Sequence, residues 1–156
     1  MIKILFICHG NICRSPMAEF ILKDMVQKKG WQEDFRIDSA ATTTEEIWNG
    51  VGNPIYPPAA KCLEKHGVSY SKEKRARLLK AEDYRKYDYL IGMDSENRYD
   101  MRRILGEDAE GKMHLLLDFT EGGGDVADPW YTRDFEVTYR DIVEGCKAFL
   151  STIRTE

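Results

Sequence analysis

A near-continuous apolar run at the start of the chain, followed at once by a polar loop and a helix, constrains the fold most. The run takes in Ile2 and residues 4–7. A strand with so few polar positions is covered on both faces, as in a parallel sheet. The loop, residues 8–14, contains Gly and Asn, and the following Ser15 and Pro16 suit an N-cap and a first helical position. We therefore predict a strand, a short loop and a helix in direct succession.

The rest of the chain alternates between the same two kinds of element. Helical spacing of apolar residues continues from Met17 to Val26, and Gly30 ends that helix. Beyond it we expect strands at 35–38, 87–93 and 113–119, and helices at 57–66, 95–105 and 133–153. Strands that alternate with helices predict a parallel sheet with right-handed crossovers.

This topology also predicts where a functional site lies. In open α/β sheets ligands bind beyond the C-terminal ends of the strands, and the 8–14 loop leaves the first strand at that end. Three other segments are expected to converge there: Asp38-Ser39, the turn at 93–97 and the loop around Asp128.

The size and charge of the chain exclude several classes of protein. Its 156 residues fit one domain, 1–156. The net charge is −4, whereas nucleic-acid-binding proteins usually carry a strong basic excess. No stretch approaches the roughly 18 apolar residues of a membrane span, and the run at 4–8 is shorter than the roughly 7–15-residue core of a signal peptide. We expect a cytoplasmic protein that binds neither nucleic acid nor membrane.

The four cysteines are predicted to be reduced thiols. They are Cys8, Cys13, Cys62 and Cys146, with no Cys-x-x-Cys pair and a spacing that suits no zinc site. Four are also few for a disulfide scaffold. Cys62 and Cys146 fall on apolar helical faces, so we interpret them as core residues. We expect no metal and no cofactor.

The 8–14 loop carries the clearest chemical signal. Successive loop N–H groups and the dipole of the following helix form a site for an anion, and Arg14 adds a planar, bidentate donor for phosphate oxygens. Cys8 stands where these dipoles point, in surroundings that lower a thiol pKa from about 8.5 toward roughly 3.5–7.5. A thiolate beneath a bound phosphate is a nucleophile directed at phosphorus.

On these residues the sequence resembles the low-molecular-weight protein tyrosine phosphatase family, over essentially the whole chain. The family's Cys-x5-Arg-Ser loop matches residues 8–15, and its Asp-Pro-aromatic-Tyr motif matches residues 128–131. The further matches are Asp38-Ser39-Ala40-Ala41-Thr42, Gly52-Asn53-Pro54, His66-Gly67, Tyr87-Asp88-Tyr89, Met93-Asp94 and the final helix. The resemblance implies a single three-layer α/β/α domain with a central four-stranded parallel sheet in the flavodoxin-like order 2-1-3-4.

The resemblance implies a catalytic set of three residues. Cys8 corresponds to the nucleophile that becomes phosphocysteine, Arg14 to the residue that binds the phosphoryl oxygens, and Asp128 to the general acid. The implied reaction is the metal-independent hydrolysis of phosphotyrosine in a protein substrate, with inorganic phosphate as product. We expect the enzyme to act as a monomer or a weak homo-oligomer.

Supporting roles follow from the same resemblance. Ser15 corresponds to a hydroxyl that donates to the thiolate, and Asn11 to a side chain that holds the loop open with Ser39 as partner. His66 corresponds to a structural histidine paired with an acidic residue at the position of Asp38.

Further loop and wall residues are expected to contact the substrate or its phosphate: His9, Gly10, Ile12, Cys13, Trp48, Trp130 and Tyr131. Cys13 corresponds to a loop cysteine that forms a reversible disulfide with Cys8 under oxidation. The protein-arginine phosphatase branch of the family carries threonine where this chain has Ile12, which favours phosphotyrosine. The basic run at 72–77 is interpreted as a solvated face.

Three other functions share part of this pattern. An arsenate reductase needs two further cysteines close together, and Cys62 and Cys146 are far apart in the sequence. A phosphocysteine carrier of the sugar-transport type passes phosphate on without hydrolysis and needs neither Arg14 nor Asp128. A non-catalytic phosphopeptide-binding module needs no nucleophile at Cys8.

Overall fold

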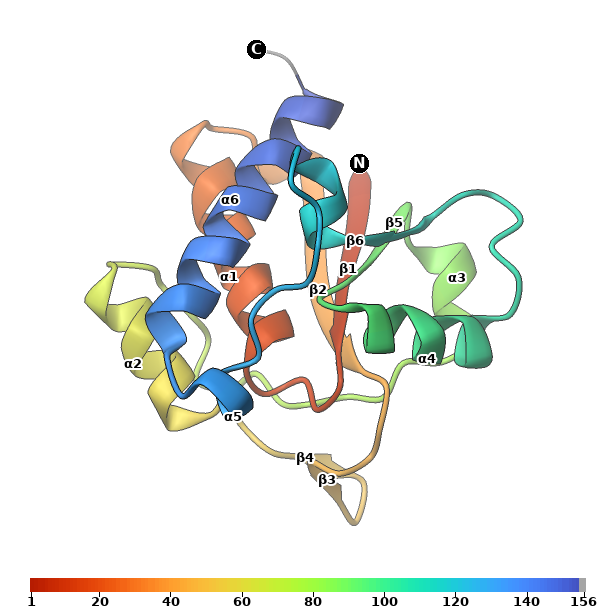
Figure 1. Cartoon of the computed structure of the whole chain (residues 1–156), viewed down its shortest axis with the longest axis horizontal. Helices are drawn as coiled ribbons and strands as arrows, with labels where there is room; N and C mark the ends of the chain where they lie inside the picture. Colours follow the sequence, from red (N-terminus) through yellow and green to blue (C-terminus); the bar gives the residue numbers. More distant parts are fainter. Residues whose placement is uncertain (155–156) are drawn as a thin grey trace.

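Four parallel strands form the central sheet of the computed structural model, which describes residues 1–154 (Figure 1). The strands are β1 (Ile2–Cys8), β2 (Phe35–Ala41), β5 (Tyr89–Gly92) and β6 (Met113–Leu115). Their order is β2-β1-β5-β6, and every neighbouring pair is parallel. These are the four expected strands in chain order, so the predicted order 2-1-3-4 is confirmed.

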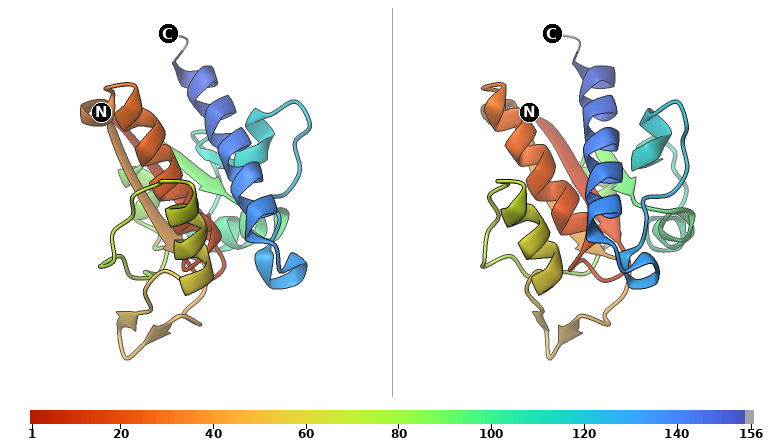
Figure 2. Two further views of the ribbon diagram at one scale, coloured as in Figure 1. Left: turned by 90° about the vertical axis from the view of Figure 1, so that its left-hand side faces the viewer. Right: turned by 60° about the vertical axis from the view of Figure 1, so that its left-hand side comes forward.

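Helices cover both faces of the sheet, which confirms the three-layer prediction. One face carries α1 (Arg14–Lys28), α2 (Pro57–Lys65) and α6 (Phe135–Ile153), and α1 and α6 run side by side there (Figure 2). The other face carries α4 (Ser95–Leu105) and the short α3 (Asp83–Lys86).

The side chains of β1 alternate between the two cores that result. Ile4 and Phe6 lie in the larger core, beneath α1 and α6, whereas Leu5 and Ile7 lie in the smaller core, beneath α4. All four are completely buried. Because successive strand residues point to opposite faces, Cys8 at the end of β1 falls on the α1 side, at the point where that helix begins.

The start of α1 differs from the prediction. The helix begins at Arg14, with Cys13 as N-cap, so Pro16 occupies the third helical position instead of the first. Pro is tolerated there because the N–H groups of the first turn have no partner within the helix. The Ser15 hydroxyl does not cap the helix but lies 2.9 Å from the Cys8 sulfur.

Other elements also differ from the predicted bounds. The strand expected at 113–119 ends at Leu115, and Leu116–Phe119 form a 3₁₀ helix. Two short strands that the apolar pattern does not predict, β3 (Ile47–Trp48) and β4 (Val51–Gly52), form a hairpin. Its turn is Asn49-Gly50, with φ of 51° and 77°, which suits the Asn-Gly turn of a tight hairpin.

Candidate active site

A cleft of about 600 Å³ opens at the C-terminal ends of the parallel strands. It is lined by four segments: residues 9–14, Glu45 and Glu46, residues 94–97 with gaps, and residues 125–131 with gaps. The loop after β1 and the short helix α5 (Pro129–Thr132) therefore meet at this end of the sheet (Figure 1). The predicted convergence of the 8–14 loop with the 93–97 turn and the Asp128 loop is present in the structure.

Three hydrogen-bond donors surround the Cys8 sulfur. The backbone N–H groups of Asn11 and Ser15 each lie 3.4 Å from Sγ, and the Ser15 hydroxyl lies 2.9 Å from it. Cys8 as a whole is 4% exposed, and its loop leads directly into the first turn of α1. These donors are placed to stabilise negative charge on sulfur.

Asn11 gives the loop its shape. Its φ of 60° is in the left-handed region, which Asn tolerates better than most residues. The side-chain nitrogen donates to the hydroxyls of Ser15 (2.8 Å) and Ser39 (2.9 Å), and the side-chain oxygen accepts from the N–H of Arg77 (3.1 Å). The expected partnership of Asn11 with Ser39 is present, and the three bonds leave this buried amide little freedom to move.

The network continues to a carboxylate that the sequence prediction did not include. The Ser39 hydroxyl donates to Glu19 at 2.6 Å, and Glu19 is only 3% exposed. Two lysines neutralise it, Lys74 at 3.1 Å and Lys23 at 2.7 Å. Breaking a buried ion pair by removing one partner is strongly destabilising, so the paired Glu19 stays in place and fixes the hydroxyl that in turn holds Asn11.

The charge of residues 72–77 suggested a solvated face, but the structure shows that part of this segment is buried. Lys74 contacts Glu19 and the Ser39 carbonyl, and its side chain is 15% exposed. Arg77 forms an ion pair with Asp83 at 3.1 Å. Ala76 between them is buried beside Ile12, so this segment supports the loop from behind.

Arg14 lies almost completely buried at the side of the cleft. Its Nη1 donates to Asp94 at 2.8 Å and to the Val126 carbonyl at 3.2 Å, and its Nη2 lies 3.5 Å from Asp128. Burial alone would lower the pKa of the guanidinium, but the negative charges of Cys8, Asp94 and Asp128 outweigh it and raise that pKa. The residue is a fixed cation beside Cys8.

Of the three aspartates that line the cleft, Asp128 makes the weakest side-chain contacts. Its Oδ1 accepts from the Trp130 N–H at 3.0 Å and its Oδ2 makes only the long contact to Arg14. Asp94 instead caps α4 through the Asn97 N–H at 2.8 Å and holds Arg14. Asp125 accepts from both the N–H and the hydroxyl of Ser95. Asp128 is therefore the aspartate of the cleft with the most freedom to contact a bound ligand.

Aromatic and acidic side chains form the rim. Trp130 and Tyr131 line the cleft and are 57% and 86% exposed, and the Trp130 ring lies 4.9 Å from that of Tyr56. His9 is held by Glu45 at 2.7 Å. Trp48, expected as a wall, is not brought to the cleft. It lies 79% exposed on the β3–β4 hairpin and is not among the lining residues, although Glu45 and Glu46 just before the hairpin are.

Cys13 lies at the far end of the loop from Cys8 and is buried. Burial, together with the charges of Cys8 and Asp128, raises the pKa of its thiol strongly. Cys13 therefore stays protonated at neutral pH. All four cysteines are free thiols in the structure.

The expected pairing of His66 with Asp38 is wrong. His66 Nε2 contacts Glu136 at 2.9 Å, at the start of α6, whereas Asp38 accepts from the Tyr87 hydroxyl at 2.7 Å and from Arg36 at 3.1 Å. The two residues belong to different surroundings, because Asp38 points from β2 toward the α3 side and His66 ends α2 on the opposite side of the sheet. His66 does not line the cleft.

Comparisons with known proteins agree with the geometry of this site. The family model described as low molecular weight phosphotyrosine protein phosphatase matches residues 3–156. The low molecular weight protein-tyrosine-phosphatase YfkJ of Bacillus subtilis is 38% identical, over 100% of this chain and 98% of its own. The low molecular weight phosphotyrosine protein phosphatase of Gallus gallus is 38% identical, over 95% and 93%. The crystal structure of YfkJ superimposes with a TM-score of 0.92 at 37% identity, covering 99% of this chain and 96% of that one.

Proposed function

The chain belongs to the low molecular weight phosphotyrosine protein phosphatase family, and from this premise we propose that it hydrolyses phosphotyrosine through a phosphocysteine formed at Cys8. The observation that carries the assignment of Cys8 is the ring of donors at its sulfur. Two backbone N–H groups and the Ser15 hydroxyl point at Sγ from within 3.4 Å. A sulfur held in this way, beside a cleft lined by the other residues of its loop, is a nucleophile and, later, a stabilised leaving group.

In the first step the Cys8 thiolate attacks phosphorus. A sulfur–phosphorus bond forms, the bond from phosphorus to the tyrosine oxygen breaks, and Asp128 gives its proton to that oxygen. The carboxyl of Asp128 lies beside Arg14 at the edge of the cleft. The products of this step are tyrosine and a phosphocysteine with the phosphate above the loop.

In the second step Asp128, now a carboxylate, takes a proton from a water molecule. The water oxygen bonds to phosphorus, the sulfur–phosphorus bond breaks, and the Cys8 thiolate leaves with the support of Ser15. Inorganic phosphate is released and every group returns to its starting protonation state.

Arg14 and the loop N–H groups stabilise the negative charge of the phosphoryl group. Nη1 of Arg14 is already taken by Asp94 and Val126, so we assign Nε and Nη2 to the phosphoryl oxygens, in the bidentate arrangement that guanidinium groups favour. Both cation and loop are in place before the substrate binds, which is electrostatic preorganisation. His9, Gly10, Ile12 and Cys13 line the same cleft and offer further backbone donors.

The rim favours particular neighbours of the phosphotyrosine. Trp130 and Tyr131 offer aromatic surface for the tyrosine ring, and four acidic residues line the outer part of the cleft: Glu45, Glu46, Glu96 and Asp125. Like charges disfavour binding. We therefore propose that basic residues beside the phosphotyrosine are preferred over acidic ones.

The cysteines indicate the cellular compartment in which the enzyme works. Cys8, Cys13, Cys62 and Cys146 are all unpaired, and free thiols persist in a reducing compartment. We propose a cytoplasmic enzyme that acts as a monomer or a weak homo-oligomer on phosphoproteins. In the described part of the chain, no helix is long and apolar enough to cross a membrane.

Phosphate release from three peptides tests this function. The peptides carry phosphotyrosine, phosphoserine or phosphoarginine in one sequence, and EDTA is present throughout. We expect turnover of the phosphotyrosine peptide, at least about 100-fold faster than of the other two. Preference for phosphoarginine contradicts the substrate class. Transfer of phosphate to the protein without release indicates a carrier. In a separate assay with arsenate and a thiol, reduction of the arsenate indicates a reductase.

A further inference from the structure

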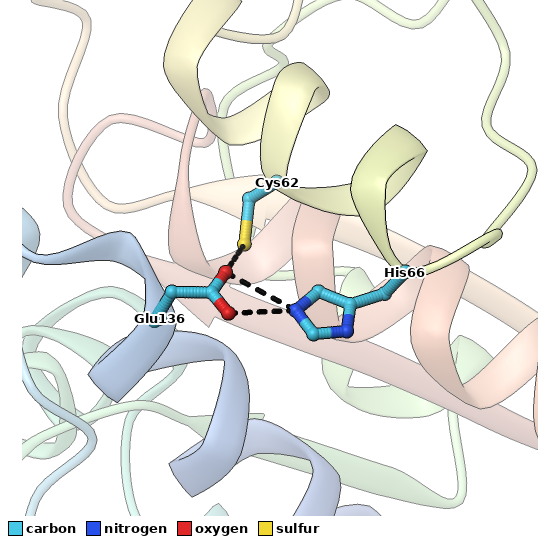
Figure 3. A group of neighbouring side chains, drawn as sticks. All are labelled: Cys62, His66 and Glu136. Atoms are coloured by element: carbon cyan, nitrogen blue, oxygen red, sulfur yellow. Dashed lines mark hydrogen bonds and ion pairs between the residues drawn. The ribbon is translucent and has the colours of Figure 1, made fainter.

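Three side chains with metal-binding atoms meet between α2 and α6, outside the catalytic cleft (Figure 3). Cys62 and His66 come from the end of α2, and Glu136 comes from the first turn of α6. Their ligand atoms all lie within 4.8 Å of one another. We propose that Cys62, His66 and Glu136 form a binding site for a zinc ion.

The distances suit one small ion. Cys62 Sγ is 3.2 Å from Glu136 Oε2, and His66 Nε2 is 2.9 Å and 3.1 Å from the two carboxylate oxygens. Zinc binds sulfur at about 2.3 Å and nitrogen or oxygen at about 2.0–2.2 Å, so tetrahedral ligands stand roughly 3.4–3.6 Å apart. The present ligand atoms need to separate by only a few tenths of an ångström along these contacts.

The fold holds the three ligands in place before any metal binds. Cys62 and His66 are four residues apart, which puts them on one face of the last turn of α2. The His66 ring lies flat on the Tyr139 ring, with centroids 3.8 Å apart and 8° between the planes. The backbone of Glu136 is held because the Asp134 side chain accepts from its N–H as the cap of α6, and its carboxylate is oriented by Cys62 and His66.

The ligand types select zinc over harder ions. Sulfur and imidazole nitrogen suit zinc, whereas Mg²⁺ and Ca²⁺ prefer oxygen ligands alone. Three protein ligands leave the fourth position of a zinc ion for water. The side chains of His66 and Glu136 are 30% and 42% exposed, so water reaches the cluster from their side while Cys62 closes it from within.

Zinc replaces the thiol proton when it binds. Without metal the Cys62 thiol donates to Glu136. On binding, the S–H bond breaks, the sulfur–zinc bond forms and the proton goes to solvent. The thiolate and the carboxylate then balance the two charges of the ion. Lys65 lies 3.8 Å from Glu136 but is 69% exposed, so it can turn into solvent.

Only one other group of this kind occurs within residues 1–154, and it offers a useful contrast. His9, Glu96 and Asp100 also come within 4.8 Å of one another. This group contains no sulfur, and His9 is already bound to Glu45. Metal at the two places is distinguishable, because only Cys62 gives a thiolate–metal absorption band.

The test uses cobalt and zinc on the Cys8→Ser protein, which removes the nucleophilic thiol of the cleft from the measurement. Co²⁺ reports thiolate ligation through its charge-transfer band, and Zn²⁺ affinity is measured by competition with a chelating dye. Cys62→Ser and His66→Gln are compared in this background. Cys146→Ala is the matched cysteine control, because Cys146 lies on α6 away from any such cluster, and His9→Asn is the control for the second group.

We expect one zinc ion per chain and a cobalt–thiolate band in the Cys8→Ser protein and in both controls. The band should vanish in Cys62→Ser. Loss of an outer partner of a metal ligand typically weakens binding about 10–100-fold, so loss of a ligand itself should weaken zinc binding by at least about 100-fold.

Absence of the cobalt–thiolate band from the Cys8→Ser protein overturns the proposal, and so does its survival in Cys62→Ser. Circular dichroism without metal shows whether the variants fold. If Cys62→Ser does not, His66→Gln decides, because this side chain lies partly in solvent at the end of α2. An unchanged zinc affinity in folded His66→Gln also overturns the site.

Discussion

Arg14 and Asp94 form a 2.8 Å ion pair at the side of the cleft, between the first helical turn after β1 and the N-cap of α4. The side chains are 5% and 17% exposed, so the pair is shielded from water. The contact explains how a buried cation keeps one orientation. It also gives Asp94 the part of a positioning residue, since both of its oxygens are already in use.

The first prediction concerns this pair. Asp94→Asn keeps the cap on α4, because Asn and Asp are equally good N-caps, but it removes the charge that holds Arg14. Misplacement of a catalytic group by about 1 Å can cost 10²-fold, so we expect kcat/KM to fall about 10–100-fold. Thermal unfolding should change little. Kinetics on phosphotyrosine peptide, with a melting curve, measure both, and a wild-type kcat/KM would show that Arg14 needs no such partner.

The second prediction concerns Asp128. A general acid matters most when the leaving group is a poor one, and its help is typically worth about 10²–10⁴-fold. Asp128→Asn should therefore slow phosphorylation of Cys8 much more for phosphotyrosine, whose phenol has a pKa near 10, than for an activated nitrophenyl phosphate.

The measurement for Asp128 is kcat/KM over a series of aryl phosphates with graded leaving-group pKa. Asp128→Asn should steepen the dependence, whereas Asp94→Asn, the matched carboxylate variant of the same cleft, should leave its slope unchanged. The same slope in Asp128→Asn and wild type would assign the proton to another group.

The third prediction concerns oxidation. Peroxide converts the Cys8 thiolate to a sulfenic acid, and the Cys13 thiol then displaces water to close a disulfide. Because burial raises the pKa of Cys13, its attack should be slow, and the sulfenic acid should be trapped by a sulfenate-specific reagent before the disulfide appears. Mass spectrometry over time follows both species. If peroxide-treated Cys13→Ser regains activity with a thiol reductant as fully as the wild type does, Cys13 does not protect Cys8 from irreversible oxidation.

The fourth prediction concerns the Tyr87–Asp38 hydrogen bond of 2.7 Å. Tyr87→Phe removes it and should lower the free energy of unfolding by about 1–2 kcal/mol near neutral pH. Burial alone would raise the pKa of Asp38, but the hydrogen bonds from Tyr87 and Arg36 outweigh it and lower that pKa. The stabilisation is thus complete above the unfolded pKa of about 3.9 and is lost as pH falls through the folded value.

The stabilisation by the Tyr87–Asp38 hydrogen bond is also lost at high pH. Burial and the contact with Asp38 raise the pKa of Tyr87 to about 12, so its contribution is complete below the unfolded pKa of about 10 and is lost as pH rises through the folded value. The difference between wild type and Tyr87→Phe should be flat from about pH 5 to 9 and shrink on both sides. Urea unfolding across this range measures it, with the exposed Tyr99→Phe as control. A difference that grows in acid contradicts the assignment.

The catalytic loop was predictable because its information is local. An apolar strand, a loop with Gly10 and Asn11, and a helix start around Ser15 follow one another within 16 residues. The parallel sheet follows from the alternation of elements, whereas its strand order comes from the family resemblance. The small differences lie at the ends of elements, where capping by side chains such as Asp134 outweighs hydrophobic period.

The supports of the loop were not predictable from local pattern, because they join distant parts of the chain. Glu19 lies among apolar residues of α1, and its buried charge is tolerated because Lys23 and Lys74 form ion pairs with it. No periodicity relates Glu19 to a lysine 55 residues later. The contact between His66 and Glu136 likewise joins residues 70 positions apart, whereas the family resemblance implied a pairing with Asp38.

The most direct measurement of the central claim is to trap the phosphoenzyme. Wild-type protein turning over a phosphotyrosine peptide in EDTA is quenched in denaturant under conditions that preserve thiophosphate esters, and tandem mass spectrometry locates the phosphate. The account predicts phosphate on Cys8 alone. With an activated nitrophenyl phosphate, whose leaving group needs little help from an acid, its level should rise in Asp128→Asn because hydrolysis of the phosphocysteine is slowed. Cys8→Ser should bind phosphate, because the loop N–H groups and Arg14 remain, yet show no turnover. Steady hydrolysis with no phosphate on Cys8, or with phosphate on another residue, would contradict it.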